Sequence, residues 1–292
     1  MSFYARKLLP AALAAGSMLL CQQAFAIAET VHPRDYIPAP AGVNLSVTYF
    51  DHRSGDDVYV DGDKVASNGD LEANAVIERL IHFTEIFGMP ADPQIIIPVV
   101  DLDVGIQGQD SSGVGDIFFG STFWPVADDK NKQWFGITPF LYVPTGEYDK
   151  DQAVNVGANR YSFVLQAGYV KALTDNLYLD VIGEVQWYGD NDDFLGNNTL
   201  AKDEAYRLSA MLSYDVSPAG YIWGRYAKQI GGEESLNGTT LADSKMDTDT
   251  ASIGYTHWLN KSLQMQVEYT RDLSVDNGIA VDGATLRMVI PF

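Results

Sequence analysis

The chain is 292 residues long and carries 39 acidic against 19 basic residues, a formal net charge of −20 at pH 7. A charge of that sign argues against a nucleic-acid partner, because the phosphate backbone repels an acidic surface. The single cysteine, Cys21, cannot build a disulfide framework or a thiolate metal site.

The first 26 residues have the order of features of a secretory signal peptide. Arg6 and Lys7 form a short basic region, residues 8–20 are an apolar run too short to span a bilayer, and the triplet ending at Ala26 is a small-x-small cleavage pattern. We predict cleavage after Ala26 rather than a buried N-terminal helix. Without Arg6 and Lys7 the 19 basic residues become 17 against 39 acidic ones, and the net charge becomes −22.

Cys21 would leave with the signal. A lipoprotein signal also places a cysteine after an apolar run, but Leu20 stands where that signal needs a small residue. Beyond Ala26 no apolar stretch reaches the about 20 residues of a transmembrane helix. The exported chain is therefore expected to be either soluble or a β-barrel, and hydrophobic periodicity has to decide between them.

Residues 27–42 form the next segment, and their sequence, IAETVHPRDYIPAPAG, is irregular and rich in proline. We predict a periplasmic N-terminal segment ahead of the main domain. It is either a small plug or a flexible tail, and the sequence leaves both open.

From Val43 to Phe292 the chain alternates apolar and polar residues with period 2, in segments of about 10 residues. In the first segment Val47 and Tyr49 oppose Ser46 and Thr48. The apolar face of each segment is expected to meet lipid and the polar face to line the lumen. Later segments with the same alternation are 161–169, 177–188, 204–217 and 263–269.

The segment 204–217 is the clearest. Tyr206 and Tyr214 stand at the two ends of an aliphatic face, and Arg207 is on the opposite face. At ~3.4 Å per residue and ~40° tilt the tyrosines are roughly 20 Å apart along the membrane normal, the height of an apolar band between aromatic girdles. A soluble sandwich would not bury mid-strand charges unpaired. We therefore predict an all-β, closed antiparallel transmembrane β-barrel of outer-membrane type over residues 43–292.

About twelve such segments can be counted. Short turns alternate with longer connections, as periplasmic turns and external loops do in barrels with an even strand number, and this parity puts both ends of the barrel on the short-turn side. The weakest segments are 76–86, which also suits a helix, and 94–102, which contains Pro98. The segments are centred near Val47, Leu80, Ile97, Phe119, Ile137, Leu165, Val181, Leu208, Gly224, Ile253, Val267 and Met288.

The long connections hold much of the acidity. Closely spaced Asp and Asn side chains can bind Ca²⁺, but the EF-hand spacing is missing. We therefore expect a solvated hydrophilic rim, no metal site and no cofactor. The long connections are predicted at 51–70, 105–113, 144–159, 189–202, 231–246 and 273–282.

Catalysis has one candidate residue, His257. An outer-membrane phospholipase would need Ser, His and Asn on neighbouring strands, but no matching serine motif is present. His257 also stands beside a short turn, where an interfacial histidine needs no special role. We predict that the protein is not an enzyme, with an outer-membrane lipid hydrolase as the less favoured alternative.

Polar residues in mid-strand are better candidates for function. Arg225 cannot face lipid near the midplane without a cost of ~2–4 kcal/mol, so it and Trp223 are expected to share the lumen. Such side chains either guide an amphipathic solute such as a phenol or pair with one another and fill a narrow interior. The lumen or substrate-path candidates are Arg160, Gln166, Glu184, Gln186, Arg207, Trp223, Arg225 and Glu268.

The chain ends inside a period-2 strand, GATLRMVIPF, from Gly283 to Phe292. In a closed barrel the last strand pairs with the first and leaves no free edge. Arg287 then faces the lumen, and Pro291 fits at the strand end because it has no N–H. A terminal Phe on such a strand resembles the signal that the outer-membrane assembly machinery reads, so we assign Phe292 to membrane assembly at the periplasmic interface.

Three motifs in the middle of the chain add what periodicity cannot. They are SGVGDIFFGSTFW (Ser112–Trp124), PFLYVPTGEYDKD (Pro139–Asp151) and VNVGANRYSFVLQAGYVKALTDN (Val154–Asn176). The ordered set resembles the outer-membrane family associated with the meta-cleavage pathway of phenol degradation, with similarity from about Val43 to Phe292. The resemblance implies a porin-like β-barrel that moves hydrophobic or aromatic compounds across the outer membrane of a Gram-negative cell.

The whole pattern predicts a monomeric outer-membrane channel or transporter for the passive uptake of small hydrophobic or aromatic compounds. Its partners would be outer-membrane lipids and lipopolysaccharide, the outer-membrane assembly machinery, and the solutes themselves. Arg160 stands where the loop 144–159 re-enters the barrel, and we expect it to pair with Glu147 or Asp149 and hold that loop over the pore. The alternative is a structural or adhesive barrel with a plugged lumen.

Overall fold

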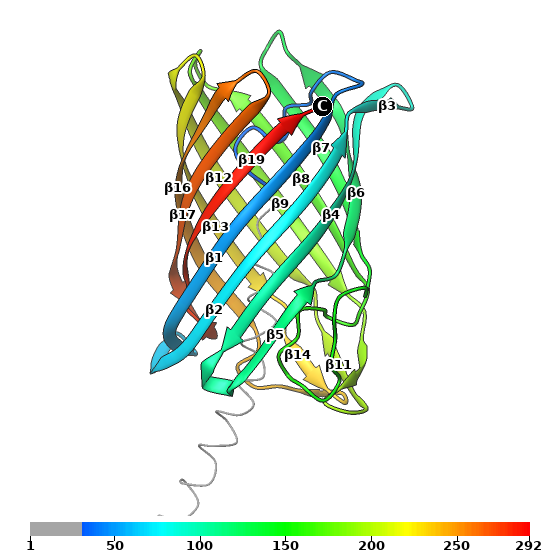
Figure 1. Cartoon of the computed structure of the whole chain (residues 1–292), viewed down its shortest axis with the longest axis vertical. Coiled ribbons are helices and arrows are strands. Elements are labelled where there is room, and N and C mark those ends of the chain that lie inside the picture. The colour runs from blue at the N-terminus through cyan, green and yellow to red at the C-terminus, as the bar shows by residue number, and fades with distance from the viewer. Residues whose placement is uncertain (1–30) are drawn as a thin grey trace, which may run out of the picture.

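The computed structural model describes residues 31–292, so the predicted signal peptide and Cys21 lie outside the described residues. The described chain is a closed antiparallel barrel with twelve wall strands (Figure 1). The predicted fold class is confirmed, and each predicted segment centre falls within one wall strand. The wall strands are β1 (Asn44–Val60), β2 (Asp63–His82), β4 (Met89–Val104), β6 (Phe118–Asp128), β7 (Gln133–Tyr142), β8 (Ser162–Ala172), β9 (Leu177–Tyr188), β12 (Ala205–Ser217), β13 (Gly220–Gly231), β16 (Met246–Asn260), β17 (Leu263–Val275) and β19 (Asp282–Pro291).

The barrel closes through β1, which pairs with β2 on one side and with β19 on the other. Leu45 lies opposite Pro291, and the N–H of Phe292 donates to the C=O of Asn44 at 3.0 Å. Pro291 is the last residue of its strand, where its missing N–H costs no ladder bond. The backbone polar groups of the wall are thus satisfied within the barrel, as a bilayer requires.

The two weakest predicted segments are both strands. Residues 76–82 belong to β2, and β3 (Thr84–Ile86) follows directly. Pro98 lies inside β4 at the point where the partner changes from β6 to β5 (Gln109–Val114). Its C=O accepts from the N–H of Gly115 at 2.9 Å. Pro98 has no N–H to donate to a neighbouring strand. The edge of β4 on which this donor is missing faces the break between β6 and β5.

The expectation of a loop at 51–70 is wrong. β1 and β2 continue as one hairpin that turns at Asp61 and Gly62, both with positive φ. Outside the membrane neither face of a strand has to be apolar, so the alternation disappears while the ladder of backbone hydrogen bonds goes on. Other long connections hold η1 (Gly105–Gln107), β5, β10 (Asn191–Phe194), β11 (Asn198–Lys202), β14 (Glu234–Leu236), β15 (Thr239–Thr240) and β18 (Gly278–Ile279).

A small sheet, β10–β11–β14–β15, stands at the long-connection end of the barrel, opposite the C-terminus (Figure 1). Together with the loop 143–161 we call it the external cap. Ala153 from the loop packs with Phe194 from the sheet in one apolar cluster. The fully buried Asn191 donates to the hydroxyl of Tyr148 at 2.9 Å. These contacts join the loop and the sheet into one unit.

The predicted faces are right in β12 and reversed in β1. In β12 Leu208 is exposed on the lipid side, whereas Met211 is buried inside. In β1, however, Val47 and Tyr49 are the buried inward residues, although they were expected to meet lipid. Alternation therefore identifies the strand but not which of its faces points outward.

The reversal of β1 has a packing cause. Val47 and Tyr49 belong to a core cluster that includes Tyr36 from the chain ahead of the barrel, so the apolar face is covered from inside. On the outer face the hydroxyl of Ser46 donates to the carboxylate of Glu78 at 2.6 Å. The hydroxyl of Thr48 donates to the other oxygen of the same carboxylate at 2.7 Å.

Among residues 31–292 no helix has the length and apolar character to cross a membrane. Within the same residues no group of three or more His, Cys, Asp and Glu side chains is arranged to hold a metal ion.

Candidate functional site: the barrel lumen

The segment that precedes β1 lies in the lumen. Val31, His32 and Tyr36 are buried there, and their contacts reach side chains of strands around the whole barrel. We call residues 31–43 the N-terminal segment. Its anchors define one end of the candidate site.

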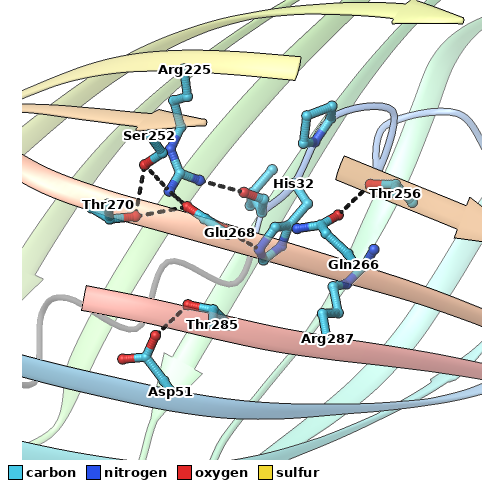
Figure 2. A network of polar contacts seen from close by, with 12 residues as sticks. His32, Asp51, Arg225, Ser252, Thr256, Gln266, Glu268, Thr270, Thr285 and Arg287 are labelled. Carbon is cyan, nitrogen blue, oxygen red and sulfur yellow. Dashed lines mark hydrogen bonds and ion pairs between the residues drawn. The ribbon is translucent and has the colours of Figure 1, made fainter. Parts of the chain in front are cut away.

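His32 anchors the start of the N-terminal segment. Its Nε2 lies 3.1 Å from the Glu268 carboxylate of β17, and its ring stacks on Tyr49 of β1 with centroids 5.5 Å apart. The same carboxylate pairs with the Arg225 guanidinium of β13 and accepts from the hydroxyl of Thr270 (Figure 2). One buried network thus ties the segment to three strands.

Arg34 and Asp35 make ion pairs with two sides of the barrel. The Arg34 guanidinium lies 2.7 Å from the Asp215 carboxylate of β12. The Asp35 carboxylate lies 2.9 Å from Arg287 of β19 and 3.7 Å from Arg79 of β2. Two wall arginines therefore face one carboxylate of the N-terminal segment.

Tyr36 occupies space that a glycine leaves open. Its hydroxyl contacts Thr138 Oγ1 at 2.9 Å and donates to Gln166 Oε1 at 2.9 Å. The indole N–H of Trp124 donates to the backbone C=O of Tyr36 at 2.9 Å. A Cβ at Gly168 of β8 would overlap the Tyr36 ring, so the wall residue beside that ring has to be glycine.

A cavity of about 210 Å³ lies between Val31 and the external cap. One side is lined by apolar side chains from β2, β4, β6 and β7, which we call the apolar wall. The other side is lined by β8, β9 and β12, which contribute Val164 and Ile182 together with a group of polar side chains that we call the polar wall. The apolar wall consists of Ala73, Ala75, Ile77, Pro98, Val100, Phe118 and Phe140, and the polar wall of Gln166, Glu184, Gln186, Arg207 and Ser209.

The centre of the polar wall is a row of cross-strand neighbours. Gln166, Glu184 and Arg207 lie opposite one another in the register of β8, β9 and β12. Gln166 Nε2 donates to Oε2 of Glu184 at 2.8 Å, while Oε1 of Glu184 lies 3.7 Å from Arg207 Nε. Arg207 also donates to Gln229 of β13 at 2.8 Å. The opposite charges of the row compensate each other, as buried charges must.

Buried cations meet a carboxylate at the cap end of the cavity. Lys202 Nζ lies 3.2 Å from the Glu234 carboxylate, and both side chains are at most 5% exposed. The Tyr188 ring lies 5.2 Å from Lys202 Nζ and 5.8 Å from Arg160 Cζ. Burial lowers the pKa of Lys202 and of Arg160, and the Glu234 charge opposes that shift at both. Pairing of Arg160 with an acidic residue of the loop stays a prediction.

The three sequence motifs meet beside the cavity. The Asp116 carboxylate accepts from the backbone N–H groups of Gly146 and Ala158, each at 2.9 Å, and burial raises its pKa. A Cβ on Gly146 would lie 2.7 Å from the Cα of Gly157, so the two backbones come as close as only glycine allows. The motifs thus hold the loop 143–161 against the link between β5 and β6.

The eight predicted lumen residues fall into two places. One group lines the cavity, and the other lies against the N-terminal segment. Whether any of them contacts a solute stays a prediction. Arg160, Gln166, Glu184, Gln186 and Arg207 line the cavity, whereas Trp223, Arg225 and Glu268 contact His32 or Val31.

The sequence analysis missed the residues that fill the lumen from inside. His32, Arg34 and Asp35 lie in a stretch without periodicity, and only their charges between prolines could have drawn attention to them. It also missed the apolar wall, because the apolar face of each segment is expected to meet lipid.

Two further residues of interest lie at the short-turn end. Phe292 is 71% exposed beyond the end of β19. His257 Nδ1 lies 2.9 Å from the hydroxyl of Tyr255, whose ring stacks on the imidazole. Both positions agree with residues of a membrane interface.

Comparisons with known proteins agree with the barrel. A family model described as "Putative MetA-pathway of phenol degradation" matches residues 54–288. The crystal structure of an outer membrane channel from Pseudomonas putida F1 is similar with a TM-score of 0.85 and 31% sequence identity, over 90% of this chain and 100% of that one. No match is found among curated proteins.

Two more distant structures resemble this chain in fold alone. One is the β domain of the Bordetella autotransporter BrkA, with 12% identity and a TM-score of 0.54 over 87% of this chain and 100% of that one. The other is a deletion mutant of the monoaromatic hydrocarbon channel TodX, with 10% identity and a TM-score of 0.52 over 87% of this chain and 90% of that one. The similar proteins that are named by activity are channels rather than enzymes.

Proposed function

The chain belongs to the phenol-degradation family whose model it matches, and we propose that it is a channel for the passive uptake of small hydrophobic or aromatic compounds. It is a β-barrel of the outer membrane, and the similar Pseudomonas putida protein is named as an outer membrane channel. The observation that carries the proposal is the two-sided cavity, which offers a ring an apolar wall and a polar wall in one space.

Two parts of the chain restrict the path through the lumen. The external cap covers the outer end of the cavity, and the N-terminal segment fills the lumen below it. In our proposal the N-terminal segment acts as a plug that narrows the pore, so that small solutes pass and larger ones do not. Its contacts with Glu268, Asp215, Arg287 and Gln166 are hydrogen bonds and ion pairs, which keep it in one position.

Deletion of residues 31–40 tests this role. The ladder between β1 and β19 closes the barrel without these residues, so the variant should still insert. We expect its ion conductance in planar bilayers to rise several-fold above a small wild-type conductance. A deletion of equal length in the external hairpin, 56–65, is the matched control and should leave conductance near the wild-type value. Two silent barrels, wild type and plug deletion, would overturn the channel proposal.

Uptake by cells tests the solute class. Cells that lack the protein should take up single-ring aromatic compounds more slowly at limiting concentration, and uptake of a small organic acid such as succinate should be unchanged. Equal uptake of every aromatic compound with and without the protein would contradict the proposal.

The remaining parts of the proposal concern the setting of the barrel. We propose a monomer without catalytic activity, whose exposed apolar side chains, such as Leu208 and Ile253, contact outer-membrane lipids and lipopolysaccharide. Phe292 would be read by the assembly machinery. Deleting Phe292 should then lower the amount of inserted barrel while transport per inserted barrel stays the same, measured by surface labelling and uptake together.

A structural or adhesive barrel is the second candidate. It is favoured by one observation, the dense network between the N-terminal segment and the wall, which would also suit a permanently closed lumen. Bilayer conductance separates the two, because a permanently closed barrel passes no ions.

A further inference from the structure

The cavity can discriminate among aromatic solutes, because its apolar wall favours an apolar surface and its polar wall favours a hydrogen-bonding one. A ring that lies against Phe118 and Phe140 buries apolar surface and gains stability from it. Glu184 and Gln186 of the polar wall line the same space, within which the other edge of that ring would lie. A purely apolar edge would take these groups out of water without giving them a hydrogen bond, which is costly.

Size limits the solute to one ring. The cavity measures about 210 Å³, and an apolar protein cavity of about 150 Å³ is known to accept benzene. One aromatic ring with a small substituent therefore fits, whereas two fused rings with substituents exceed the space. The apolar wall also includes Ile77 and Val100, and the polar groups beside it, Asp51 and Arg53, already pair with each other.

Three pairs of opposite charges at the cavity compensate each other. Arg207 faces Glu184 across 3.7 Å, and Lys202 lies 3.2 Å from Glu234. Arg53, near the apolar wall, donates to Asp51 at 2.9 Å. A solute with a net charge would enter this enclosed space without a counter-charge of its own, which disfavours both aromatic acids and aromatic ammonium ions.

Among the described residues, one oxygen of the Glu184 carboxylate in the polar wall accepts no hydrogen bond. Oε2 of Glu184 accepts from Gln166, but Oε1 lies 3.7 Å from Arg207 Nε, which is too long for a hydrogen bond. The Glu184 side chain is 20% exposed within the lumen. A hydroxyl group on a ring could donate to Oε1 and sit between the two side chains.

Resting on the channel function proposed above, we propose that the cavity selects neutral, hydroxylated single-ring aromatic compounds over aromatic hydrocarbons and aromatic carboxylates. Glu184 is the specificity-determining residue, because it supplies the acceptor for the ring hydroxyl and balances the charge of Arg207. A hydrocarbon leaves this acceptor unpaired, and a carboxylate is repelled by it.

The test compares phenol, toluene and benzoate as blockers of the ion current through the full-length barrel in planar bilayers. Ion current is the readout because small apolar rings cross lipid without a channel. For the wild type we expect phenol to interrupt the current at a concentration at least about tenfold lower than toluene, the effect of one hydrogen bond to a charged acceptor. Benzoate should be the weakest of the three.

Two variants of Glu184 give different signatures. Glu184→Gln keeps an acceptor oxygen but removes the charge opposite Arg207, so block by phenol should persist while block by benzoate strengthens. Glu184→Leu removes the acceptor, so phenol and toluene should become equal blockers. Glu72→Gln removes one negative charge from an exposed position on β2 outside the cavity and should change none of the three values.

Each outcome of these measurements either supports or overturns the proposed selectivity. A wild-type barrel that conducts ions but is blocked equally by phenol and toluene overturns the selectivity and leaves the channel function intact. A barrel that conducts nothing overturns both. Retention of the phenol preference in Glu184→Leu, with a steady ion current as evidence that the variant has inserted, assigns the selectivity elsewhere and overturns the role of Glu184.

Discussion

The wall of the barrel has two parts that present opposite surfaces to the lumen. Along β1 and β2 the inward side chains include Val47 and Ile77, while Glu78 points outward. Along β12, β13 and β17 the inward side chains include Arg225 and Glu268, and the outward ones are mostly apolar. We call the first part the apolar sector and the second the polar sector.

The difference shows that the apolar face of a barrel strand can be buried either against lipid outside or against protein in the lumen. In the polar sector lipid covers the apolar outer face, and the N-terminal segment meets the inner face through polar groups such as His32, so the pattern is apolar outside and polar inside. In the apolar sector the lumen is also a cover, because the N-terminal segment and the cavity lie against it. The interior of the barrel is amphipathic as a result of this arrangement.

The largest effect is expected in the polar sector, at Glu268. Its carboxylate compensates Arg225 and contacts His32 in a buried network. Glu268→Gln should lower the free energy of unfolding by about 3–5 kcal/mol, the cost of breaking a buried ion pair. Urea titration of the barrel in lipid vesicles measures it. Glu72→Gln, on an exposed position, is the control and should stay within about 0.5 kcal/mol.

A network that owes its stability to packing rather than to charge would give a different result. In that case Glu268→Gln would unfold at nearly the wild-type urea concentration, and the polar sector would not depend on its ion pairs.

The outer face of the polar sector should be the next most sensitive place. Ala210 points to lipid midway between Tyr206 and Tyr214. Ala210→Lys should cost about 2–4 kcal/mol, because a charge at the bilayer midplane is poorly solvated. Tyr206→Lys puts the same charge near an interface, where about 0–1 kcal/mol is expected. Equal losses at the two positions, from the same urea titration, would show that Ala210 does not lie near the midplane.

The inner face of the apolar sector should respond less strongly. Ile77 is 3% exposed and lines the cavity. Ile77→Thr should cost about 1–3 kcal/mol, because its hydroxyl would be buried against apolar neighbours. The reverse change in the polar sector, Thr270→Val, removes hydrogen bonds to Glu268 and Ser252 and should cost about 0.5–1.5 kcal/mol each. If Ile77→Thr is neutral, the apolar sector is as wet as the polar one, and the comparison fails.

The sequence predicts the strands of both sectors but the outward face of only one. In β12 the aromatic residues at both ends of one face, Tyr206 and Tyr214, identify the lipid side. In β1 no such bracket exists, and the apolar face of Val47 is covered by a segment whose position no local pattern specifies. Alternation records that a face is buried, whereas the identity of its cover depends on contacts between residues far apart in the chain.

The candidate site shows the same division. Lumen positions such as Glu184 follow from alternation within one strand. The cavity does not, because the external cap closes it through Asp116, Gly146 and Gly157, which lie on three separate stretches of chain. The motifs that carry the family resemblance contain these residues, but their meeting point becomes visible only in the fold.

The smallest effect is expected on the outer face of the apolar sector, at Glu78. A carboxylate on a lipid-facing strand would be costly alone, but the hydroxyls of Ser46 and Thr48 donate to its two oxygens at 2.6 and 2.7 Å. Glu78→Gln removes the charge and weakens one of these hydrogen bonds. The gain and the loss oppose each other, so the free energy of unfolding should change by less than about 1 kcal/mol.

The two hydroxyls provide the contrasting experiment at the same place. Removing both donors in a Ser46→Ala, Thr48→Val double variant while Glu78 stays should cost more than Glu78→Gln, because the carboxylate would then face lipid without a protein donor. A double variant as stable as the wild type would mean that water or lipid headgroups already solvate Glu78. The apolar sector would then contact lipid only on one side of Glu78 along the strand. The reversal of β1 would in that case reflect a thin apolar band of the membrane rather than the cover on the inner face of β1.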